Sequence, residues 1–334
     1  MDNAREAKEG GRGLAMVTTY WTDKKVLITG GSGFLGSYLT TLLNAQGCLP
    51  FTPRSSEYDL RYPWCIKKLF HDIGKVDTVI HLAANVGGIG YNRLHPYQLF
   101  YDNALMAIHL VEHAIRNKVS KFVGVGTVCA YPKFAPTPFR EESLWDGYPE
   151  ETNAAYGLAK KMLLVQLQAA RQEYGFNGIY LLPTNLYGPK DNFNPVQSHV
   201  IPALIQKCVQ AKMTLSEMVE VWGSGSATRD FLFVEDAAEA ILLAAEHYNL
   251  GDPLNLGSGQ ETRIYMLLHH IMELVGYKGE VKWDNTKPDG QPRRVLDTRQ
   301  AKLLLNWAAK TPLREGLKRT IAWYMVEESL ESVV

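Results

Sequence analysis

Two side chains spaced four residues apart are suited to acid–base chemistry. Tyr156 and Lys160 lie at positions i and i+4 of residues 154–175, whose apolar periodicity predicts a helix, so the two share one helix face. A nearby ammonium favours the phenolate and lowers the pKa of a tyrosine. Such a tyrosine can exchange a proton with a substrate oxygen while a cofactor exchanges a hydride. A Y-x-x-x-K match alone is common, so its meaning depends on its position in the fold.

Two further side chains lie where they could reach the same substrate. Thr127 is near the carboxyl end of a strand predicted within residues 121–131, and Cys129, two residues on, would lie on the same strand face. His199 directly precedes an apolar segment. Each also has a structural interpretation: a satisfied strand-end hydroxyl, a small buried hydrophobe and a helix N-terminal histidine, respectively.

A glycine-rich turn follows the first predicted strand. The segment KKVLITGGSGFLG predicts a strand, a turn and the start of a helix. In such a turn the first glycine permits the tight bend, the second lets the backbone approach a pyrophosphate and the third allows close packing of helix on strand. The helix N-terminus favours the anion. The sequence therefore predicts a dinucleotide site at Gly30, Gly33, Phe34, Leu35 and Gly36.

The residues after the expected second strand indicate which dinucleotide binds. An acid in this place would bind a ribose 2′-hydroxyl, whereas an arginine suits a 2′-phosphate. The segment LPFTPRSSEYDL offers Arg54 followed by two serines, and no acid before Glu57. We therefore expect NADP rather than NAD. Arg54 could also be a solvated surface charge, and Pro50 and Pro53 are unfavourable in a central strand.

The elements that position these residues alternate along the chain. Such alternation predicts an α/β fold, namely a Rossmann-type doubly wound parallel sheet with helices on both faces and a smaller mixed α/β C-terminal substrate domain. The further strands are expected within residues 76–84, 121–131 and 176–189, and the helices at 105–117 and 154–175.

We expect three parts in the chain. Residues 1–23 are a flexible N-terminal tail, residues 24–190 form the dinucleotide-binding domain, and residues 191–334 are mainly the substrate-binding domain, with some segments returning to the Rossmann core. The site is expected in the cleft between the two domains, outside the carboxyl ends of the strands.

The composition excludes several other classes of function. Lysine plus arginine and aspartate plus glutamate number 35 each among 334 residues, which argues against a nucleic-acid or membrane-surface binder. The four cysteines include no C-x-x-C pair, so neither a metal site nor a redox dithiol is expected. With no signal peptide or membrane-length apolar run visible, the expected location is the cytoplasm.

Together, the turn, Thr127, Tyr156 and Lys160 resemble the extended short-chain dehydrogenase/reductase superfamily over residues 24–325. Dehydratases of that superfamily carry an Asp–Glu pair after the threonine, where this chain has Val128 and Cys129. Longer stretches are similar to the GDP-L-fucose synthase family: VGGIGYN (86–92), CAYPKFAPTPFREE (129–142), PTNLYGPKDNF (183–193), SHVIPALI (198–205), VWGSGSATRDFLFVEDAA (221–238) and KPDGQPRR (287–294). The resemblance implies inversion of sugar carbons 3 and 5 of GDP-4-keto-6-deoxy-D-mannose, followed by NADPH-dependent reduction at carbon 4.

The resemblance also implies a role for each matching residue. Cys129 would be the base and His199 the acid of the epimerisation, while Thr127, Tyr156 and Lys160 would serve the reduction. The implied cofactor site adds residues around the turn and at strand ends: Arg54, Asp59, Leu60, Leu82, Ala83, Ala84, Pro183, Thr184, Asn185, Leu186 and His199, together with Tyr156 and Lys160. The implied GDP-sugar site comprises Val86, Gly87, Gly88, Asn185, Lys207, Trp222, Arg229, Asp289 and Arg294. A homodimer through the Tyr156 helix and its neighbour is implied as well.

Two departures and two alternatives remain. Thr127 stands where many of these synthases have serine, and Ser32 stands where some have an arginine that helps to bind the 2′-phosphate. The same residues could act on another GDP-4-keto sugar, such as a GDP-heptose, or epimerise without net reduction. A non-catalytic nucleotide-binding regulator should lack one of the catalytic groups, whereas all five are present here.

Overall fold

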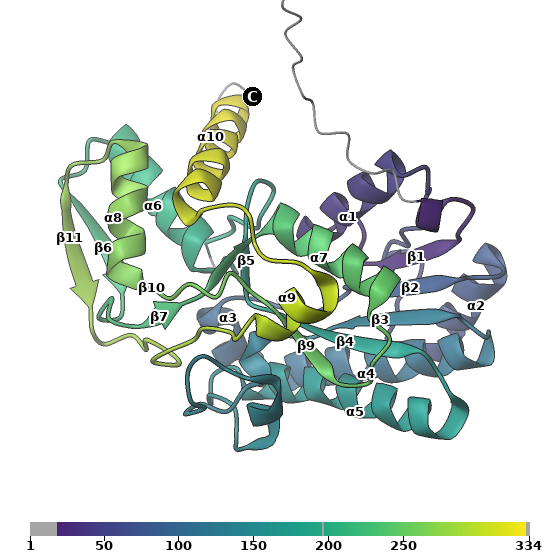
Figure 1. The fold of residues 1–334 in the computed structure, drawn as a ribbon. Helices are drawn as coiled ribbons and strands as arrows, with labels where there is room; N and C mark the ends of the chain where they lie inside the picture. Colours follow the sequence, from purple (N-terminus) through teal and green to yellow (C-terminus); the bar gives the residue numbers. More distant parts are fainter. Residues whose placement is uncertain (1–18, 196, 332–334) are drawn as a thin grey trace, which may run out of the picture.

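The computed structural model describes residues 19–195 and 197–331. Its main sheet has five parallel strands in the order β1-β2-β3-β4-β9 (Figure 1). The first four strands are buried along their whole length, which requires helices on both faces of the sheet. The five strands are β1 (Val26–Thr29), β2 (Thr78–His81), β3 (Lys121–Val125), β4 (Gly178–Pro183) and β9 (Pro253–Leu256). The expected parallel α/β sheet is confirmed.

The second strand expected from the sequence is reduced to one residue. Phe51 forms an isolated parallel bridge with Leu27, donating its N–H to Val26 O at 2.8 Å and accepting from Ile28 N at 2.9 Å. Phe51 therefore lies on one side of β1, and β2 pairs with β1 on the other side. After β1 the chain first moves to one side of this strand and later returns to the opposite side. The glycine-rich turn thus lies where the strand order reverses, the usual ligand position of such folds. Pro50 and Pro53 limit the pairing because proline lacks the N–H donor.

Helices cover both faces of this sheet. On one face α1 (Phe34–Ala45) packs against α7 (Val234–His247), with α9 (Arg299–Leu305) beside β9. On the other lie α2 (Pro63–Ile73), α4 (Pro96–Arg116) and α5 (Ala154–Tyr174). The helix expected at residues 105–117 already begins at Pro96, because proline is favoured in the first turn. The end of α5 agrees with the expectation, since Gly175 closes it with a left-handed φ of 65°.

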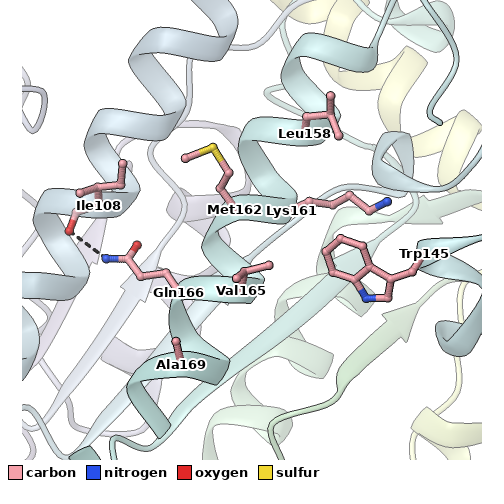
Figure 2. A pocket seen from close by; sticks show the side chains of 8 residues that line it. All are labelled: Ile108, Trp145, Leu158, Lys161, Met162, Val165, Gln166 and Ala169. Atoms are coloured by element: carbon pink, nitrogen blue, oxygen red, sulfur yellow. Dashed lines mark hydrogen bonds between the residues drawn. The ribbon is translucent and has the colours of Figure 1, made fainter. Parts of the chain in front are cut away.

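The outer faces of α4 and α5 are unusually apolar. They line an open surface pocket of 490 Å³ on the side away from the sheet (Figure 2). Gln166 Nε2 of α5 donates to Ile108 O of α4 at 3.0 Å and joins the two helices across it. Aliphatic side chains and one tryptophan dominate the lining, which consists of Ile108, Trp145, Leu158, Lys161, Met162, Val165, Gln166 and Ala169.

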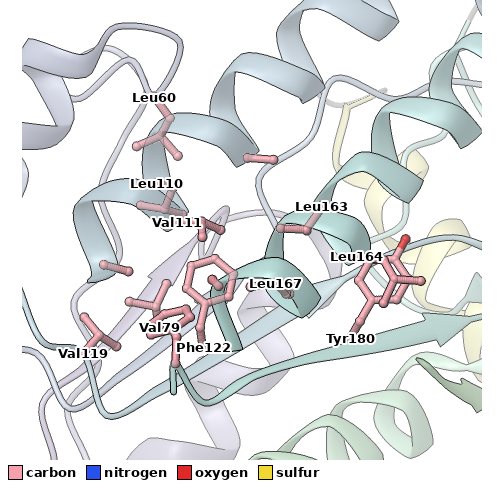
Figure 3. Packing of buried hydrophobic residues seen from close by; sticks show 14 of the residues in the cluster. Leu60, Val79, Leu110, Val111, Val119, Phe122, Leu163, Leu164, Leu167 and Tyr180 are labelled. Carbon is pink, nitrogen blue, oxygen red and sulfur yellow. The ribbon is translucent and has the colours of Figure 1, made fainter. Parts of the chain in front are cut away.

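The inner faces of the same helices build the core above the sheet. Leu110 and Val111 of α4 and Leu163, Leu164 and Leu167 of α5 are buried at helical spacing (Figure 3). They pack on side chains that project from three neighbouring strands, Val79, Phe122 and Tyr180. This packing fixes the position of α5, which carries the Tyr156–Lys160 pair.

A second group of elements surrounds a separate core. Strands β6 (Met218–Trp222) and β11 (Glu280–Asp284) pair in parallel and pack with α6 (Val200–Met213), α8 (Ile264–Val275) and α10 (Leu313–Glu331). Two short pairs connect this group to the main sheet, β5 (Asn185–Tyr187) with β8 (Phe231–Phe233) and β7 (Thr228–Arg229) with β10 (Thr262–Arg263). Helix α3 (Ile89–Leu94) precedes α4.

Three differences from the expected elements bear on the site. The strand expected over 121–131 ends at Val125, and that expected over 176–189 divides into β4 and β5, which belong to different sheets. At the N-terminal side, Trp21 lies in a short 3₁₀ helix (Thr19–Trp21) and is fully buried, so residues 19–23 of the expected tail belong to the packed structure. Residues 1–18 of that tail lie outside the described residues. Within the described ranges, no helix combines the length and apolarity needed to cross a bilayer.

Candidate active site

The glycine-rich turn is shaped so that neither Gly30 nor Gly36 can be replaced without strain. Gly30 has a φ of 71°, and a Cβ there would lie 2.9 Å from Ala83 N at the end of β2. A Cβ on Gly36 would lie 2.2 Å from Gly30 O. Helix α1 begins at Phe34, and no side chain caps its N-terminus at Gly33. The first-turn N–H groups, including that of Leu35, therefore suit an external anion such as a pyrophosphate.

The residues expected around the adenosine end have different surroundings. Arg54 is exposed and has no ion-pair partner among the described residues. The Asp59 carboxylate is instead held by Arg61, with contacts of 2.9 and 2.6 Å that lower the pKa of Asp59. Leu60 is buried in the core. Arg54 is thus available to a phosphate, whereas the side chain of Asp59 is already occupied.

The Tyr156–Lys160 pair lies deep at the start of α5. Both side chains are buried, and Lys160 Nζ donates to Val125 O at 3.1 Å and lies 6.0 Å from the centre of the Tyr156 ring. Burial lowers the pKa of Lys160 to about 8. Burial, and then the charge of Cys129, raise the pKa of Tyr156 well above its usual value. The expected lowering of this pKa is therefore wrong, because burial disfavours the charged phenolate. The phenol is held as an acid.

A buried histidine that the sequence analysis missed lies near Lys160. His81 Nδ1 is 2.8 Å from Thr29 Oγ1, and that oxygen also accepts from Ala83 N at 3.3 Å. Burial, and then the charge of Lys160, lower the pKa of His81 to about 3, so its ring is neutral. The pair links the end of β1 to the partly exposed Leu82–Ala84 segment beside Gly30. No spacing in the sequence indicates this contact, since both residues lie inside buried strands.

Thr127 and Cys129 are close together, but not for the expected reason. They cannot share a strand face, since β3 ends at Val125 and Cys129 lies in a 3₁₀ helix (Val128–Ala130). Thr127 caps this helix, its Oγ1 accepting from Cys129 N at 3.2 Å. A Cβ on Gly157 would lie 2.6 Å from Cys129 O, so α5 packs tightly on the turn. Cys129 is therefore fixed next to the residue that follows Tyr156.

Arg294 brings Cys129 and the segment after β4 together. Its Nη1 lies 3.5 Å from Cys129 Sγ and 3.4 Å from Asn185 Oδ1. Asn185 Nδ2 and Thr184 Oγ1 both donate to Asp230 O, at 2.8 and 3.0 Å. Pro183 ends β4, and Leu186 continues in β5. The four residues 183–186 thus lie at the carboxyl end of the sheet, with Asn185 facing the thiol through Arg294.

His199 lies at the N-cap of α6, next to the 86–88 segment. Gly88 N donates to Gln197 O at 2.9 Å, and a Cβ on Gly88 would lie 2.5 Å from Ser198 O. Val86 is exposed and Gly87 is buried. The His199 side chain is open to solvent on one side, yet the surrounding protein, and then the charge of Arg294, lower its pKa. Two segments far apart in the sequence therefore meet beside His199.

The remaining expected GDP-sugar residues form two groups. Arg229 is buried and donates to Thr228 O, Gln291 O and Asp289 O at 2.6–2.9 Å, and burial lowers its pKa to about 9. The Asp289 carboxylate accepts from Ser224 N at 2.8 Å and from Ser224 Oγ at 2.7 Å. Both side chains are thus engaged within the protein.

The second group lies along α6 and β6. Lys207 Nζ donates to Glu220 O at 2.8 Å, two residues before Trp222. The Trp222 ring is half exposed, and Lys287 Nζ lies 5.5 Å from its centre. An exposed aromatic ring beside a cation can stack on a base.

Two buried residues that the sequence analysis missed support this arrangement. Asp230 accepts from the backbone of Ser258 at 3.0 Å and of Leu296 at 3.3 Å. Gln291 Nε2 donates to Pro132 O at 3.0 Å, and its Oε1 accepts from Arg294 Nε at 3.1 Å. Each of the two residues forms hydrogen bonds to segments distant in the sequence, and no local sequence motif indicates such bonds. Within the described ranges, no cluster of His, Cys, Asp and Glu has a metal-binding arrangement.

Comparison with known proteins gives consistent matches. The NAD dependent epimerase/dehydratase family matches residues 26–257. A GDP-L-fucose synthase of Sinorhizobium fredii is 38% identical over 297 residues, covering 89% of this chain and 94% of the relative. A solved GDP-L-fucose synthetase of Naegleria fowleri bound to NADP has a TM-score of 0.82 at 27% identity, covering 92% of this chain and 96% of that one. A C. jejuni GDP-6-OMe-4-keto-L-xylo-heptose reductase has a TM-score of 0.85 at 25% identity, covering 91% and 98%.

Proposed function

Because the chain belongs to the NAD dependent epimerase/dehydratase family, we propose that it converts GDP-4-keto-6-deoxy-D-mannose to GDP-L-fucose with NADPH. The protein is an NAD(P)-dependent enzyme of the epimerase and reductase type, and the resemblance to GDP-L-fucose synthases expected from its motifs is confirmed. The observation that carries the specific proposal is the position of the Cys129 thiol. It lies beside Arg294 and Asn185, and its backbone packs on the helix that carries Tyr156. A base for epimerisation thus lies beside an acid for reduction.

The residues of the turn fit a dinucleotide. Gly36 packs against Gly30 O so closely that the turn leaves no room for a Cβ. The N–H groups in the first turn of α1 have no side-chain cap and can bind the pyrophosphate. Residues 82–84 and 183–186 would line the remainder of the site. When bound, the cofactor supplies the hydride for the reduction. Arg54, exposed and without an ion-pair partner among the described residues, supports NADP over NAD because a 2′-phosphate pairs with a guanidinium.

The epimerisation requires a base and an acid on opposite faces of the sugar. The ketone at carbon 4 acidifies the protons on carbons 3 and 5, so the Cys129 thiolate can remove one and leave an enolate. A proton from His199 then arrives on the other face and inverts the centre. A lowered pKa makes the imidazolium of His199 a readier proton donor. The same pair of groups serves both carbons if the sugar is repositioned between the two inversions.

The reduction uses the groups at the start of α5. Tyr156 is held as a phenol and donates its proton to the oxygen at carbon 4 as that oxygen gains charge. Thr127 donates a hydrogen bond to the same oxygen. Lys160 lies beneath the phenol, and its ammonium stabilises the phenolate that forms.

One assay with two variants tests this proposal. Purified protein should oxidise NADPH when given GDP-4-keto-6-deoxy-D-mannose and should form a product identified as GDP-L-fucose. Cys129→Ser should slow deuterium exchange at carbons 3 and 5 more than reduction, and Tyr156→Phe should do the reverse, each by about 100-fold. No loss of NADPH at saturating substrate would refute the assignment, and equal loss of both steps in Cys129→Ser would refute a separate base.

One alternative substrate has specific support. The C. jejuni structure carries the name of a reductase of a GDP-4-keto-heptose, and it covers nearly the whole chain. A GDP-4-keto-heptose would present the same diphosphate and ketone to the same residues. Turnover of the two sugars in parallel separates the proposals, and the larger kcat/KM identifies the substrate. An epimerase without net reduction would consume no NADPH with either sugar.

We also propose that two copies associate through the outer faces of α4 and α5. The pocket on this surface is lined mainly by apolar side chains, and Trp145, Val165 and Ile108 are exposed there. An exposed apolar surface rimmed by polar side chains is a candidate for protein–protein contact. Packing two helices of each copy against each other would cover it and would hold Tyr156, on the inner side of α5, in place.

A further inference from the structure

We propose that Arg294 is a positioning residue that holds Cys129 as a thiolate, and not chiefly a ligand of the GDP-sugar. This inference rests on the proposed epimerisation, in which the thiolate is the base. A thiolate is the reactive form of cysteine, and a neighbouring arginine favours it over the thiol. At 3.5 Å, Arg294 Nη1 is within hydrogen-bonding distance of Cys129 Sγ.

The setting of Arg294 supports this role. Arg294 is only 5% exposed, and no carboxylate pairs with its guanidinium among residues 19–195 and 197–331. Nε is fixed by Gln291 Oε1 at 3.1 Å, and Gln291 is itself fixed to Pro132 O and Lys133 O. A buried cation without an anionic partner destabilises a fold, so such a charge requires another explanation. The sulfur that it faces becomes an anion when Cys129 acts as the base.

Other charged groups around Cys129 do not replace this partner. Arg229 also interacts electrostatically with Cys129, but three backbone carbonyls hold its guanidinium, and Glu150 and Asp289 offset its charge. Tyr156 is protonated and adds no positive charge. His199 lies within the field of Arg294 rather than directly against the sulfur. Arg294 is therefore the cation whose donor points at the thiol.

The position of Arg294 affects both halves of the proton exchange. The same positive charge that favours a thiolate at Cys129 makes the imidazolium of His199 a stronger acid. For each inversion, Cys129 gains the proton taken from carbon and His199 gives one to the other face. The thiol then loses its proton to solvent and His199 regains one, so the site returns to its starting state. One cation would thus prepare base and acid together.

Alkylation of Cys129 by iodoacetamide, followed by peptide mass spectrometry, tests this role without any substrate. The protein carries its own reference in Cys65, which is partly exposed on α2. Relative to Cys65, alkylation of Cys129 at neutral pH should fall about tenfold in Arg294→Gln, and its pH profile should move to higher pH. Arg294→Lys, which keeps the charge, should recover most of the rate. Arg293→Gln removes the neighbouring exposed arginine, which pairs with Glu261, and should change nothing.

Three outcomes would overturn the inference. An unchanged ratio in Arg294→Gln would show that the guanidinium does not act on the thiol. Equal losses in the Gln and Lys variants would assign the effect to packing rather than to charge. If Arg294→Gln does not fold, the ultraviolet difference between wild type and Cys129→Ser reports the thiolate directly, and its absence below about pH 8 would refute the inference.

The same variants separate this inference from the proposed function. If Arg294 instead holds the diphosphate, Arg294→Gln raises KM and leaves alkylation unchanged. If the protein does not oxidise NADPH with the proposed sugar, yet alkylation follows the charge at position 294, the function is refuted and the role of Arg294 remains.

Discussion

Replacing Lys160 with methionine should make the cofactor-free protein more stable while abolishing ketone reduction. Lys160 is only 4% exposed, and its ammonium donates to Val125 O at 3.1 Å, with no carboxylate paired to it among the described residues. The folded protein therefore holds an ammonium away from water, which raises its free energy. Methionine has a similar length and no charge, so it should fill the same space without that penalty.

The magnitude follows from the pKa of Lys160. A fall from 10.5 to about 8 corresponds to about 3 kcal/mol, because each pKa unit is worth about 1.4 kcal/mol. Removing the ammonium also leaves Val125 O without its donor, which costs about 1 kcal/mol. We therefore expect the free energy of unfolding to rise by about 2 kcal/mol at neutral pH.

The effect should depend on pH in a defined direction. Below about pH 8, Lys160 is charged in both the folded and unfolded states, so the wild type carries the full penalty. Between about 8 and 10.5 the unfolded chain binds more protons, and wild-type stability rises. Above that range the residue is neutral in both states. The advantage of Lys160→Met should therefore shrink as the pH rises through this window.

Urea unfolding of the cofactor-free protein at several pH values measures this difference. Lys302→Met on α9 is the matched control, because Lys302 is exposed and its removal should change stability little at any pH. A less stable Lys160→Met at neutral pH, or a difference that does not vary with pH, would refute the reasoning. The burial of charge would then not be the dominant effect at this position.

Three further perturbations have defined outcomes. Gly36→Ala places a methyl group 2.2 Å from Gly30 O and should weaken NADPH binding at least about tenfold in a fluorescence titration, whereas Gly90→Ala, with room for a methyl group, should not. Arg54→Gln should raise KM for NADPH about tenfold and leave KM for NADH unchanged, and an equal rise for both would argue against a 2′-phosphate site. Val165→Glu should convert a dimer to a monomer in size-exclusion chromatography with light scattering, since the side chain is half exposed in the α4–α5 pocket. A wild-type monomer would refute that interface.

Strands β1 to β4 of the main sheet could be predicted because their signal is local, whereas β9 was not expected. Each of the four is a short apolar run, and segments of helical periodicity alternate with them along the chain. The ends of the strands could not be predicted in the same way. Thr127 lies in an apolar segment, but its hydroxyl binds Cys129 N and starts a 3₁₀ turn, a local bond that competes with the sheet. Asn185 likewise continues the apolar run of β4, yet it pairs with Phe231 in another sheet.

Candidate catalytic residues could be proposed from the motifs, but their electrostatics could not. A tyrosine and a lysine on one helix face predict a lowered phenol pKa, whereas the burial of Tyr156 raises its pKa. Burial depends on residues distant in the sequence, such as the packing of Gly157 against Cys129 O. Gln291 was missed for the same reason. It connects Arg294 to the carbonyl of Pro132, a residue far from it in the chain, and no spacing reveals that contact.

The charges of the site explain why an electrically neutral chain suits an anionic substrate. Acidic and basic residues balance at 35 each, yet Lys160, Arg229 and Arg294 are all buried, and across the described ranges none forms an ion pair with a carboxylate. Each donates its hydrogen bonds to neutral groups, which fix its position without pairing its charge directly with a carboxylate. Such charges destabilise the free protein, and a diphosphate, an enolate or a thiolate would offset them. Binding of an anionic ligand should therefore raise the free energy of unfolding, because the ligand offsets the cost of burying these three charges.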